Sequence, residues 1–213
     1  MTPPVRFITL EGPEGSGKTS HMGPLSKWLE SQGWLVLCTR EPGGTPISEQ
    51  IRSIIHDLKN KEMHPHTETL LYQAARAQIV EQVIRPTLAQ GGIVLCDRYA
   101  DSTLAYQGYG HRQNLEEVRA LINYATAGLQ PDLTVLLDLD VEIGLQRGSQ
   151  RRSRGGEWNR LDAYELEFHQ RVRQGYLELV KAEPQRWVVV DAAMSWQEVQ
   201  TALRQVISDR LKT

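Results

Sequence analysis

Residues Gly12-Pro-Glu-Gly-Ser-Gly-Lys18-Thr19 decide the fold of this chain, because they match the pattern G-x-x-x-x-G-K-[ST] between a strand signal and a helix signal. The run Val5–Leu10 before them is apolar, as in a buried strand, and Met22, Leu25 and Leu29 after them share one helical face. Glycines let such a turn direct its main-chain N–H groups inward, and the helix N-terminus adds partial positive charge. The motif therefore predicts a concave anion site that suits nucleotide phosphates.

Outside this motif, short runs rich in Val, Ile and Leu alternate with longer amphipathic stretches. The predicted strands are Val5–Leu10, Trp34–Cys38, Ile93–Cys96, Leu133–Leu139 and Trp187–Val190, and such continuous apolar runs are typical of strands buried on both faces. One helical stripe is predicted over Leu71, Ala75, Ile79 and Val83, and another over Trp196, Val199, Leu203 and Val206. This alternation predicts the α/β class: a doubly wound parallel sheet of five strands flanked by helices, of the P-loop NTPase type, in one domain spanning residues 1–213.

The phosphate-binding motif also predicts a nucleotide and a metal. Its Lys18 should reach the β- and γ-phosphates of ATP, and the Thr19 hydroxyl should bind Mg²⁺. Asp97 ends the buried run Ile93–Cys96, the place where a doubly wound sheet positions its ligand chemistry, so it is the second predicted metal ligand. The residues expected to contact ATP are therefore Gly12, Pro13, Glu14, Gly15, Ser16, Gly17, Lys18 and Thr19.

Composition excludes several other classes of protein. The net charge is −2, so no overall field would recruit nucleic acid or an anionic membrane. Cys38 and Cys96 both lie in apolar runs and are expected to be buried core thiols, not a disulfide framework or a metal site. No run approaches the ~20 apolar residues that span a bilayer. The N-terminal residues lack the apolar stretch of a signal peptide, so the expected compartment is the cytoplasm.

An arginine-rich segment interrupts the alternation of strands and helices. Residues 148–158 are polar and contain glycine, which predicts an exposed, mobile lid over about 148–160, and five arginines crowd this region: Arg147, Arg151, Arg152, Arg154 and Arg160. A solvated basic loop is the plain interpretation of such a run. In a phosphoryl-transfer enzyme, however, an arginine aimed at the transferred group accelerates the reaction by orders of magnitude. The Gly-rich motif contains no arginine, so the lid is the candidate source of that cation, with Arg151, Arg152 and Arg154 as alternatives.

Four further motifs carry a resemblance to a known family. Thr39-Arg-Glu-Pro-Gly-Gly44, Leu70-Leu-Tyr-Gln-Ala-Ala-Arg76, Asp97-Arg-Tyr99 and Tyr106-Gln-Gly-Tyr-Gly110 follow the Gly-rich motif in order. Together they resemble thymidylate kinases, of the bacterial branch that keeps its catalytic arginine in the lid, from about Phe7 to about Asp191. The resemblance implies Mg²⁺-dependent transfer of the ATP γ-phosphoryl group to dTMP, and a homodimer formed through helix packing.

The resemblance also implies roles for individual residues. Arg40 and Arg98 both follow strand ends and would clamp the dTMP phosphate with their guanidinium forks. Tyr72 and Arg76 lie four residues apart on one helix face, where the ring would stack on thymine and the guanidinium would donate to a carbonyl. By the same resemblance, Ser102, Tyr106 and Gln107 would close the base and sugar pocket, and Glu14 would contact the sugar or the clamping arginine. Arg147 would stack on adenine. The implied catalytic residues are Lys18, Arg98 and the lid arginines.

The sequence departs from the family pattern at three places. Tyr72 stands where phenylalanine is more usual, which keeps the ring but adds a hydroxyl that needs a partner. His111 replaces a more usual arginine. Asn159-Arg160-Leu161-Asp162 replaces an acid-Arg-aromatic-Glu sequence, so an amide stands at position 159 where the family has a carboxylate.

Two other activities remain open at the level of sequence. Another nucleoside monophosphate kinase, or a deoxynucleoside kinase, would share the Gly-rich motif, and the latter would need a carboxylate base such as Glu41 or Glu14. A P-loop switch or partition protein would bind a partner in place of transferring phosphate. The chain lacks the N-K-x-D motif of guanine-nucleotide switches, and the acceptor-side residues would have no use in such a protein.

Overall fold

Five strands form one all-parallel sheet in the order β2-β3-β1-β4-β5. The computed structural model describes residues 5–153, 155, 160–161 and 164–212. The strands are β1 (Phe7–Glu11), β2 (Val36–Arg40), β3 (Ile93–Asp97), β4 (Leu133–Asp138) and β5 (Trp187–Asp191), and each end lies within two residues of its predicted position. The predicted five-stranded parallel sheet is confirmed.

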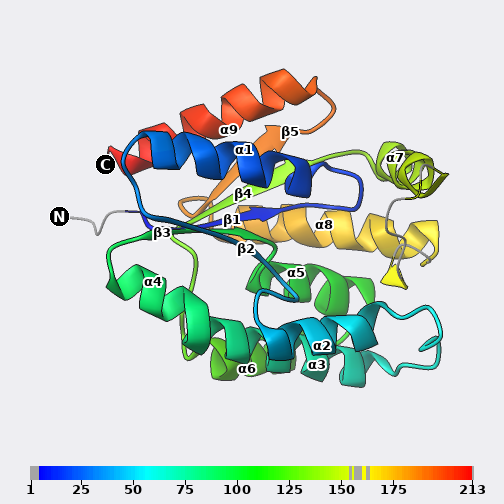
Figure 1. The fold of residues 1–213 in the computed structure, drawn as a ribbon. Coiled ribbons are helices and arrows are strands. Elements are labelled where there is room, and N and C mark those ends of the chain that lie inside the picture. Colours follow the sequence, from blue (N-terminus) through cyan, green and yellow to red (C-terminus); the bar gives the residue numbers. More distant parts are fainter. Residues whose placement is uncertain (1–4, 154, 156–159, 162–163, 213) are drawn as a thin grey trace.

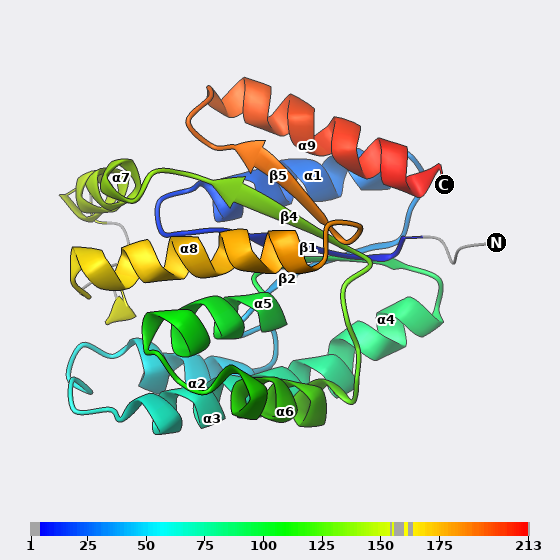
Figure 2. The same cartoon turned by 180° about the vertical axis from the view of Figure 1, so that it is seen from behind.

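Helices connect the strands and cover both faces of the sheet (Figures 1 and 2). They are α1 (Lys18–Ser31), α2 (Pro46–His56), α3 (Pro65–Ile79), α4 (Arg85–Ala89), α5 (Ala100–Thr103), α6 (Leu115–Thr126), α7 (Val141–Ser153), α8 (Leu166–Ala182) and α9 (Trp196–Leu211). Two stretches, η1 (Val80–Ile84) and η2 (Leu104–Gly110), are π-helical and continue α3 and α5. Among the described residues, no helix combines the length and the apolar character needed to cross a bilayer.

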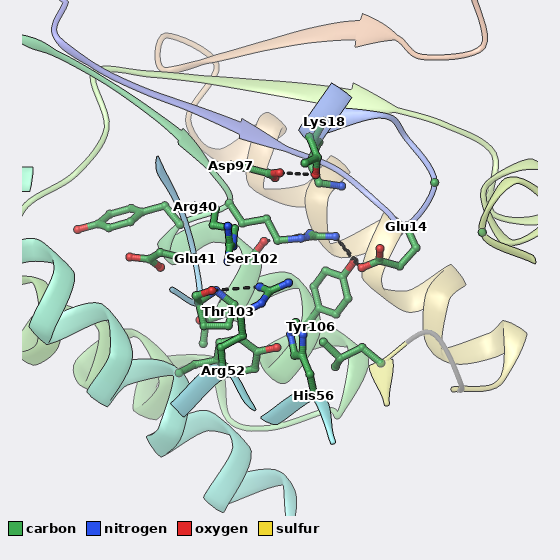
Figure 3. A pocket seen from close by; sticks show the side chains of 18 of the residues that line it. Glu14, Lys18, Arg40, Glu41, Arg52, His56, Asp97, Ser102, Thr103 and Tyr106 are labelled. Carbon is green, nitrogen blue, oxygen red and sulfur yellow. Dashed lines mark hydrogen bonds and ion pairs between the residues drawn. The ribbon is translucent and has the colours of Figure 1, made fainter. Parts of the chain in front are cut away.

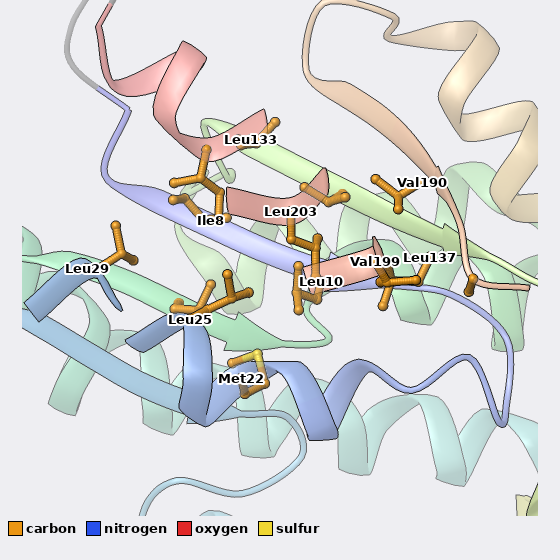
Figure 4. Packing of buried hydrophobic residues seen from close by; sticks show 14 of the residues in the cluster. Ile8, Leu10, Met22, Leu25, Leu29, Leu133, Leu137, Val190, Val199 and Leu203 are labelled. Carbon is orange, nitrogen blue, oxygen red and sulfur yellow. The ribbon is translucent and has the colours of Figure 1, made fainter. Parts of the chain in front are cut away.

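Helices α1 and α9 cover one face of the sheet (Figure 4). Ile8 and Leu10 of β1 point toward this side and pack with Met22 of α1 and with Val199 and Leu203 of α9. The pairing follows from the period of two along a strand, which sends alternate side chains to opposite faces. This cluster fixes α1, and therefore the Gly-rich turn before it, against the centre of the sheet.

The opposite face is covered in two parts. Phe7 of β1 and Val94 of β3 pack with Ile79 and Ile84, which come from α3 and η1. A separate cluster joins β4 and β5 to α8, η2 and α6, with Tyr176 of α8 fully buried inside it. Elements from these two parts carry side chains to the same edge of the sheet, where strands β1, β2 and β3 end.

The edge strands are less covered than predicted. All five residues of β1 and of β3 are buried, whereas β2 and β5 lie at the two edges and contain exposed residues. Cys38 of β2 is exposed, so the prediction of a buried thiol is wrong for Cys38 and confirmed for Cys96. An edge strand has a neighbour on one side only, and its apolar run does not reveal that position in the sheet.

The predicted exposed loop at 148–160 is partly helical. Helix α7 continues to Ser153, so residues 148–153 extend a helix that begins at Val141. Gln and Arg are good helix formers, and a single glycine such as Gly148 costs only about 1 kcal/mol within a helix. Of the remaining lid positions, Arg154 and Asn159 lie outside the described residues, and of Arg151 only the main chain is described.

Candidate active site

A cavity of about 710 Å³ opens at the carboxyl ends of β1, β2 and β3. In Figure 3, Lys18 and Asp97 lie at one end of this pocket and Arg52 and His56 lie at the other. The predicted site residues in its wall are Glu14, Gly15, Gly17, Lys18, Thr19, Arg40, Tyr72, Arg76, Asp97, Arg98, Ser102, Tyr106, Gln107 and Arg147. Gly12, Pro13 and Ser16 belong to the same turn as Lys18 but are not among the residues that form the wall.

Close packing explains two glycines of the turn. Gly12 and Gly15 have φ angles of 145° and 73°, which residues other than glycine rarely adopt. A Cβ atom would also collide with the main-chain oxygen of Leu137 at the first position and with that of Gly144 at the second. The turn therefore lies directly against the end of β4 and against α7, the helix that leads into the lid.

Lys18 is held inside the turn. Its ammonium donates to the carbonyl oxygens of Gly12 and Pro13, both at 2.9 Å, and to Ser16 Oγ at 3.1 Å. Burial, together with repulsion from Arg98, lowers the pKa of Lys18 to about 8, although nearby carboxylates oppose the shift. The ammonium therefore remains largely protonated at neutral pH, at the point where phosphate oxygens are predicted to bind.

The two predicted metal ligands meet. Thr19 Oγ1 donates to Asp97 Oδ2 at 2.6 Å, although the residues are 78 positions apart. A hydroxyl and one carboxylate are the oxygen ligands that Mg²⁺ accepts, and this ion takes its remaining ligands from water and substrate phosphates. Among the described residues, no group of three or more His, Cys, Asp or Glu side chains could hold a metal alone. The pair therefore fits a metal that arrives with a nucleotide.

Arg98 lines the pocket and is surrounded by hydrogen-bond acceptors. Its NH2 group donates to Glu14 Oε1 at 2.6 Å and to Tyr106 Oη at 3.0 Å, and its NH1 group donates to Gly12 O and Ser102 Oγ. The residue has a φ of 67°, a left-handed conformation that costs energy for a side chain of this size and that persists only where the surroundings enforce it. The guanidinium is therefore fixed before any substrate arrives.

Glu14 remains ionised because of this contact. Burial alone would raise its pKa, but the positive charges of Arg98 and Lys18 and the hydrogen bond from Tyr106 lower it to about 2. Of the two contacts predicted for Glu14, with the acceptor sugar or with the arginine of the phosphate clamp, the structure contains an ion pair with Arg98 at 2.6 Å.

A second buried acid supports Arg98 and was not predicted. Glu11, the last residue of β1, is fully buried and accepts hydrogen bonds from Tyr99 N at 2.7 Å, Ser102 Oγ at 2.6 Å and Tyr176 Oη at 2.8 Å. Burial raises the pKa of Glu11, and Asp101 adds to the shift while Arg98 opposes it. The signal available in the sequence was an acid in the last position of a buried strand, next to the Gly-rich turn.

Arg40 and Arg98 are not equivalent members of the predicted phosphate clamp. Arg40 also faces the pocket, but its NH2 group lies 3.0 Å from each carboxylate oxygen of Glu49 in α2, and its side chain is half exposed. A phosphate that contacted Arg40 would therefore share the guanidinium with Glu49. Arg98 is the buried, fixed cation, and Arg40 is the exposed one.

Arg76 has few donors left for a base. Its Nε donates to Glu41 Oε2 at 2.7 Å, NH1 donates to Gln73 and Thr103, and NH2 donates to Tyr99 O. The side chain is almost fully buried yet lines the pocket, and one N–H of NH2 has no acceptor among the described residues. The predicted donation to a ring carbonyl is therefore limited to that one N–H.

The end of the pocket away from Lys18 contains residues that sequence analysis did not single out. Arg52 and His56 of α2 lie at this end in Figure 3, and Tyr72 and Leu161, which belong to one apolar cluster, also line the pocket. Burial and the charge of Arg52 lower the pKa of His56 to about 3, so its imidazole is neutral at physiological pH. The Tyr72 hydroxyl has no hydrogen-bond partner among the described residues.

Arg147 of α7 lines the pocket from the side of the lid, and its NH1 group donates to the main-chain oxygen of Ala192 at 3.0 Å. Arg152 is in the same helix but is not among the residues that line the pocket.

Comparisons with known proteins agree over nearly the whole chain. A family model described as thymidylate kinase matches residues 10–203. The thymidylate kinase of Herpetosiphon aurantiacus is 49% identical over 228 residues, with 97% of each chain covered. The thymidylate kinase of Roseiflexus sp. is 54% identical over 197 residues, covering 89% of this chain and 87% of its own. The crystal structure of thymidylate kinase from Ehrlichia chaffeensis has a TM-score of 0.75 at 30% identity and covers 97% of this chain and 99% of its own.

Proposed function

The chain belongs to the thymidylate kinase family and phosphorylates dTMP to dTDP, and on that premise we propose which residues hold the two substrates and how they act. The ATP phosphates bind at the end of the pocket that contains Lys18, and the thymine base binds at the end that contains Tyr72 and Arg76. Arg98 lies between them and binds the dTMP phosphate. The observation that carries this assignment is one continuous cavity with a phosphate-binding turn at one end and an aromatic–guanidinium pair in its wall.

No side chain has to act as a nucleophile or a strong base. The acceptor is a phosphate oxygen that is already anionic, so catalysis comes from positioning and from charge stabilisation. Lys18 stabilises charge on the donor phosphates. Arg98 is pre-aligned by Glu14, Tyr106 and Ser102 and reorganises little when the acceptor phosphate arrives.

We further propose that Mg²⁺ is the metal, with Thr19 and Asp97 as its protein ligands. The 2.6 Å contact between their oxygen atoms supports the assignment, since one ion could contact both. When bound, Mg²⁺ would neutralise negative charge on the phosphates.

Arginines of the lid complete the proposed catalytic set. Neutralising Arg151, Arg152 and Arg154 one at a time should identify one position with a large loss of kcat and nearly unchanged KM, the pattern of a contact made only in the transition state. Three small and equal effects would support the solvated-loop interpretation. Arg147, which reaches the pocket wall, is proposed to stack on adenine.

The same geometry argues against a deoxynucleoside kinase. That reaction needs a free carboxylate near an acceptor hydroxyl, and the two candidates were Glu14 and Glu41. Glu14 is paired with Arg98, and Glu41 is buried against Arg76. The test is coupled release of ADP with a panel of acceptors: dTMP, dUMP, other monophosphates and thymidine. Turnover with thymidine but not with dTMP would overturn the assignment.

We also propose that the enzyme is a cytoplasmic homodimer formed through α2, α3 and α6, which pack together (Figure 1). Large apolar side chains are exposed on and beside these helices: Ile47, Ile54, Leu58, Leu70 and Tyr124. Sedimentation of the wild type at micromolar concentration should give a dimer, and Leu70→Glu should shift it to the monomer. A monomeric wild type would contradict this interface.

A further inference from the structure

Glu68 of α3 is a fully buried carboxylate that takes no part in the roles proposed above. It accepts hydrogen bonds from two parts of the chain far apart in sequence. Gln107 Nε2 at 2.7 Å and His111 Nε2 at 3.2 Å come from η2 and the turn after it. Arg160, in a short ion pair, and Tyr164 Oη at 3.3 Å come from the segment that precedes α8. A buried acid with four donors is an anchor between elements.

The charge of Glu68 is secured by these partners. Burial would raise its pKa, but the hydrogen bond from His111 and the charge of Arg160 lower it to about 2. Glu68 is therefore a carboxylate throughout the physiological pH range, and its contact with Arg160 is a true ion pair. His111, which departs from the family pattern, forms a hydrogen bond with this carboxylate and is not among the residues that line the pocket.

The guanidinium of Arg160 binds the segment before α8 to helices α2 and α3. Besides Glu68, it donates from Nε to the carbonyl oxygen of Ile55 in α2 at 3.1 Å and from NH1 to Tyr164 Oη at 2.6 Å. Its side chain is only 6% exposed. The position of the main chain at 160 and 161 is therefore set by α2 and α3.

Leu161 is the residue that this anchor places in the pocket. It is buried, and it lines the cavity together with Tyr72, which lies one helical turn after Glu68 in α3. Gln107 both lines the cavity and donates to Glu68. One buried acid is thus connected to three parts of the wall at the end that receives the base.

We propose that Glu68 is a positioning residue for the acceptor: through its ion pair with Arg160 it holds Leu161 against the base end of the pocket. The inference rests on the proposed function, because it assumes that the base of dTMP lies beside Tyr72. It assigns Glu68 a role in acceptor binding and none in holding ATP. Displacing a positioned group by about 1 Å can cost as much as 10²-fold in rate.

The test compares Glu68→Gln, Arg160→Gln, their double variant, Leu161→Ala, and Glu68→Gln combined with Leu161→Ala, by steady-state kinetics with dTMP and ATP varied separately. Each single variant should raise KM for dTMP by roughly tenfold or more and leave KM for ATP within about twofold, by the same positional argument. The Glu68→Gln, Arg160→Gln double variant should be no worse than Arg160→Gln alone, because both replacements break the same ion pair and Arg160→Gln already loses the hydrogen bond to Ile55 O. Leu161→Ala should raise KM for dTMP, and its effect should not multiply with that of Glu68→Gln.

A matched control is Glu81→Gln, which removes a carboxylate from an exposed ion pair with Arg85 and should change neither KM. Single variants that leave one charge buried and unpaired can fail to fold, whereas the double variant leaves neither charge and keeps the test decidable. A folded double variant with wild-type KM for dTMP would overturn the proposal, as would multiplicative effects of Glu68→Gln and Leu161→Ala. Failure of the proposed function is distinct, since the wild type would then release no ADP in response to dTMP.

Discussion

Replacing Arg98 by alanine should weaken binding of the acceptor and also lower the free energy of unfolding. The contacts of Arg98 allow the size of each effect to be worked out separately. Arg98 and Glu14 form a 2.6 Å ion pair whose side chains are 16% and 19% exposed. Removing the cation leaves a nearly buried carboxylate alone, which costs about 3 kcal/mol of stability at the lower end of the range for buried pairs. Losing one charge-assisted hydrogen bond to the dTMP phosphate costs about 1.5–3 kcal/mol, or roughly 10- to 150-fold in kcat/KM.

The informative comparison is Arg98→Ala with the double variant Arg98→Ala, Glu14→Gln. The glutamine removes the unpaired charge and keeps an acceptor for Tyr106, whose hydroxyl donates to Glu14 at 2.9 Å. Stability should recover in part, whereas kcat/KM for dTMP should not.

Urea unfolding gives the stability of each variant, and coupled release of ADP with dTMP or ATP varied gives the kinetics. The Kd for ATP, from fluorescence titration, should change little in Arg98→Ala. If kcat/KM for dTMP recovers along with stability in the double variant, Arg98 acts through the fold and the phosphate clamp is refuted.

Replacements at three other positions probe separate parts of the pocket. Lys18→Ala should lower kcat by at least roughly 10²–10³-fold, since the ammonium is proposed to contact phosphate in the transition state. Its far-ultraviolet circular dichroism spectrum should be unchanged. A variant with near-normal turnover would contradict the assignment of the phosphate-binding turn. Tyr72→Phe should leave kcat/KM for dTMP and dUMP nearly unchanged, whereas Tyr72→Ala should lose about 1–3 kcal/mol of stacking, and equal damage in both variants would rule out the stack. Burial raises the pKa of Glu41 to about 7 against the opposing charge of Arg76, so the folded state retains a proton that the unfolded chain has released. The resulting stability is present below about pH 4.5 and disappears as pH rises toward 7. Across that window, the free energy of urea unfolding of the wild type should fall by about 3 kcal/mol relative to that of Glu41→Gln. A difference that stays constant with pH would show that Glu41 stays ionised.

Local patterns in the sequence predicted the sheet and one end of the site. Each strand is a short apolar run, and the Gly-rich turn carries its geometry in adjacent residues, so both are visible without the fold. The contact between Thr19 and Asp97 could also be predicted, because the carboxyl ends of parallel strands meet at one edge of the sheet.

The supports of the site could not be predicted in the same way. Glu11 and Glu68 are single acids in apolar or helical surroundings, and their partners come from helices far along the chain. Tyr176 lies 165 positions from Glu11, so no local spacing marks the pair. The conformation of Arg98 is likewise imposed by its surroundings and not by its neighbours in sequence.

The exposed edge strand provides a convenient labelling position. The chain has two cysteines, and Cys96 is fully buried with a strongly raised pKa, so a maleimide dye would attach to Cys38 without prior mutagenesis. Partial burial of the Cys38 sulfur and the nearby charge of Asp97 raise its pKa as well, which makes mildly alkaline buffer the suitable medium. Because Cys38 lies two residues before Arg40, a dye attached there would report on the loop that follows β2 during turnover, in protein of wild-type sequence.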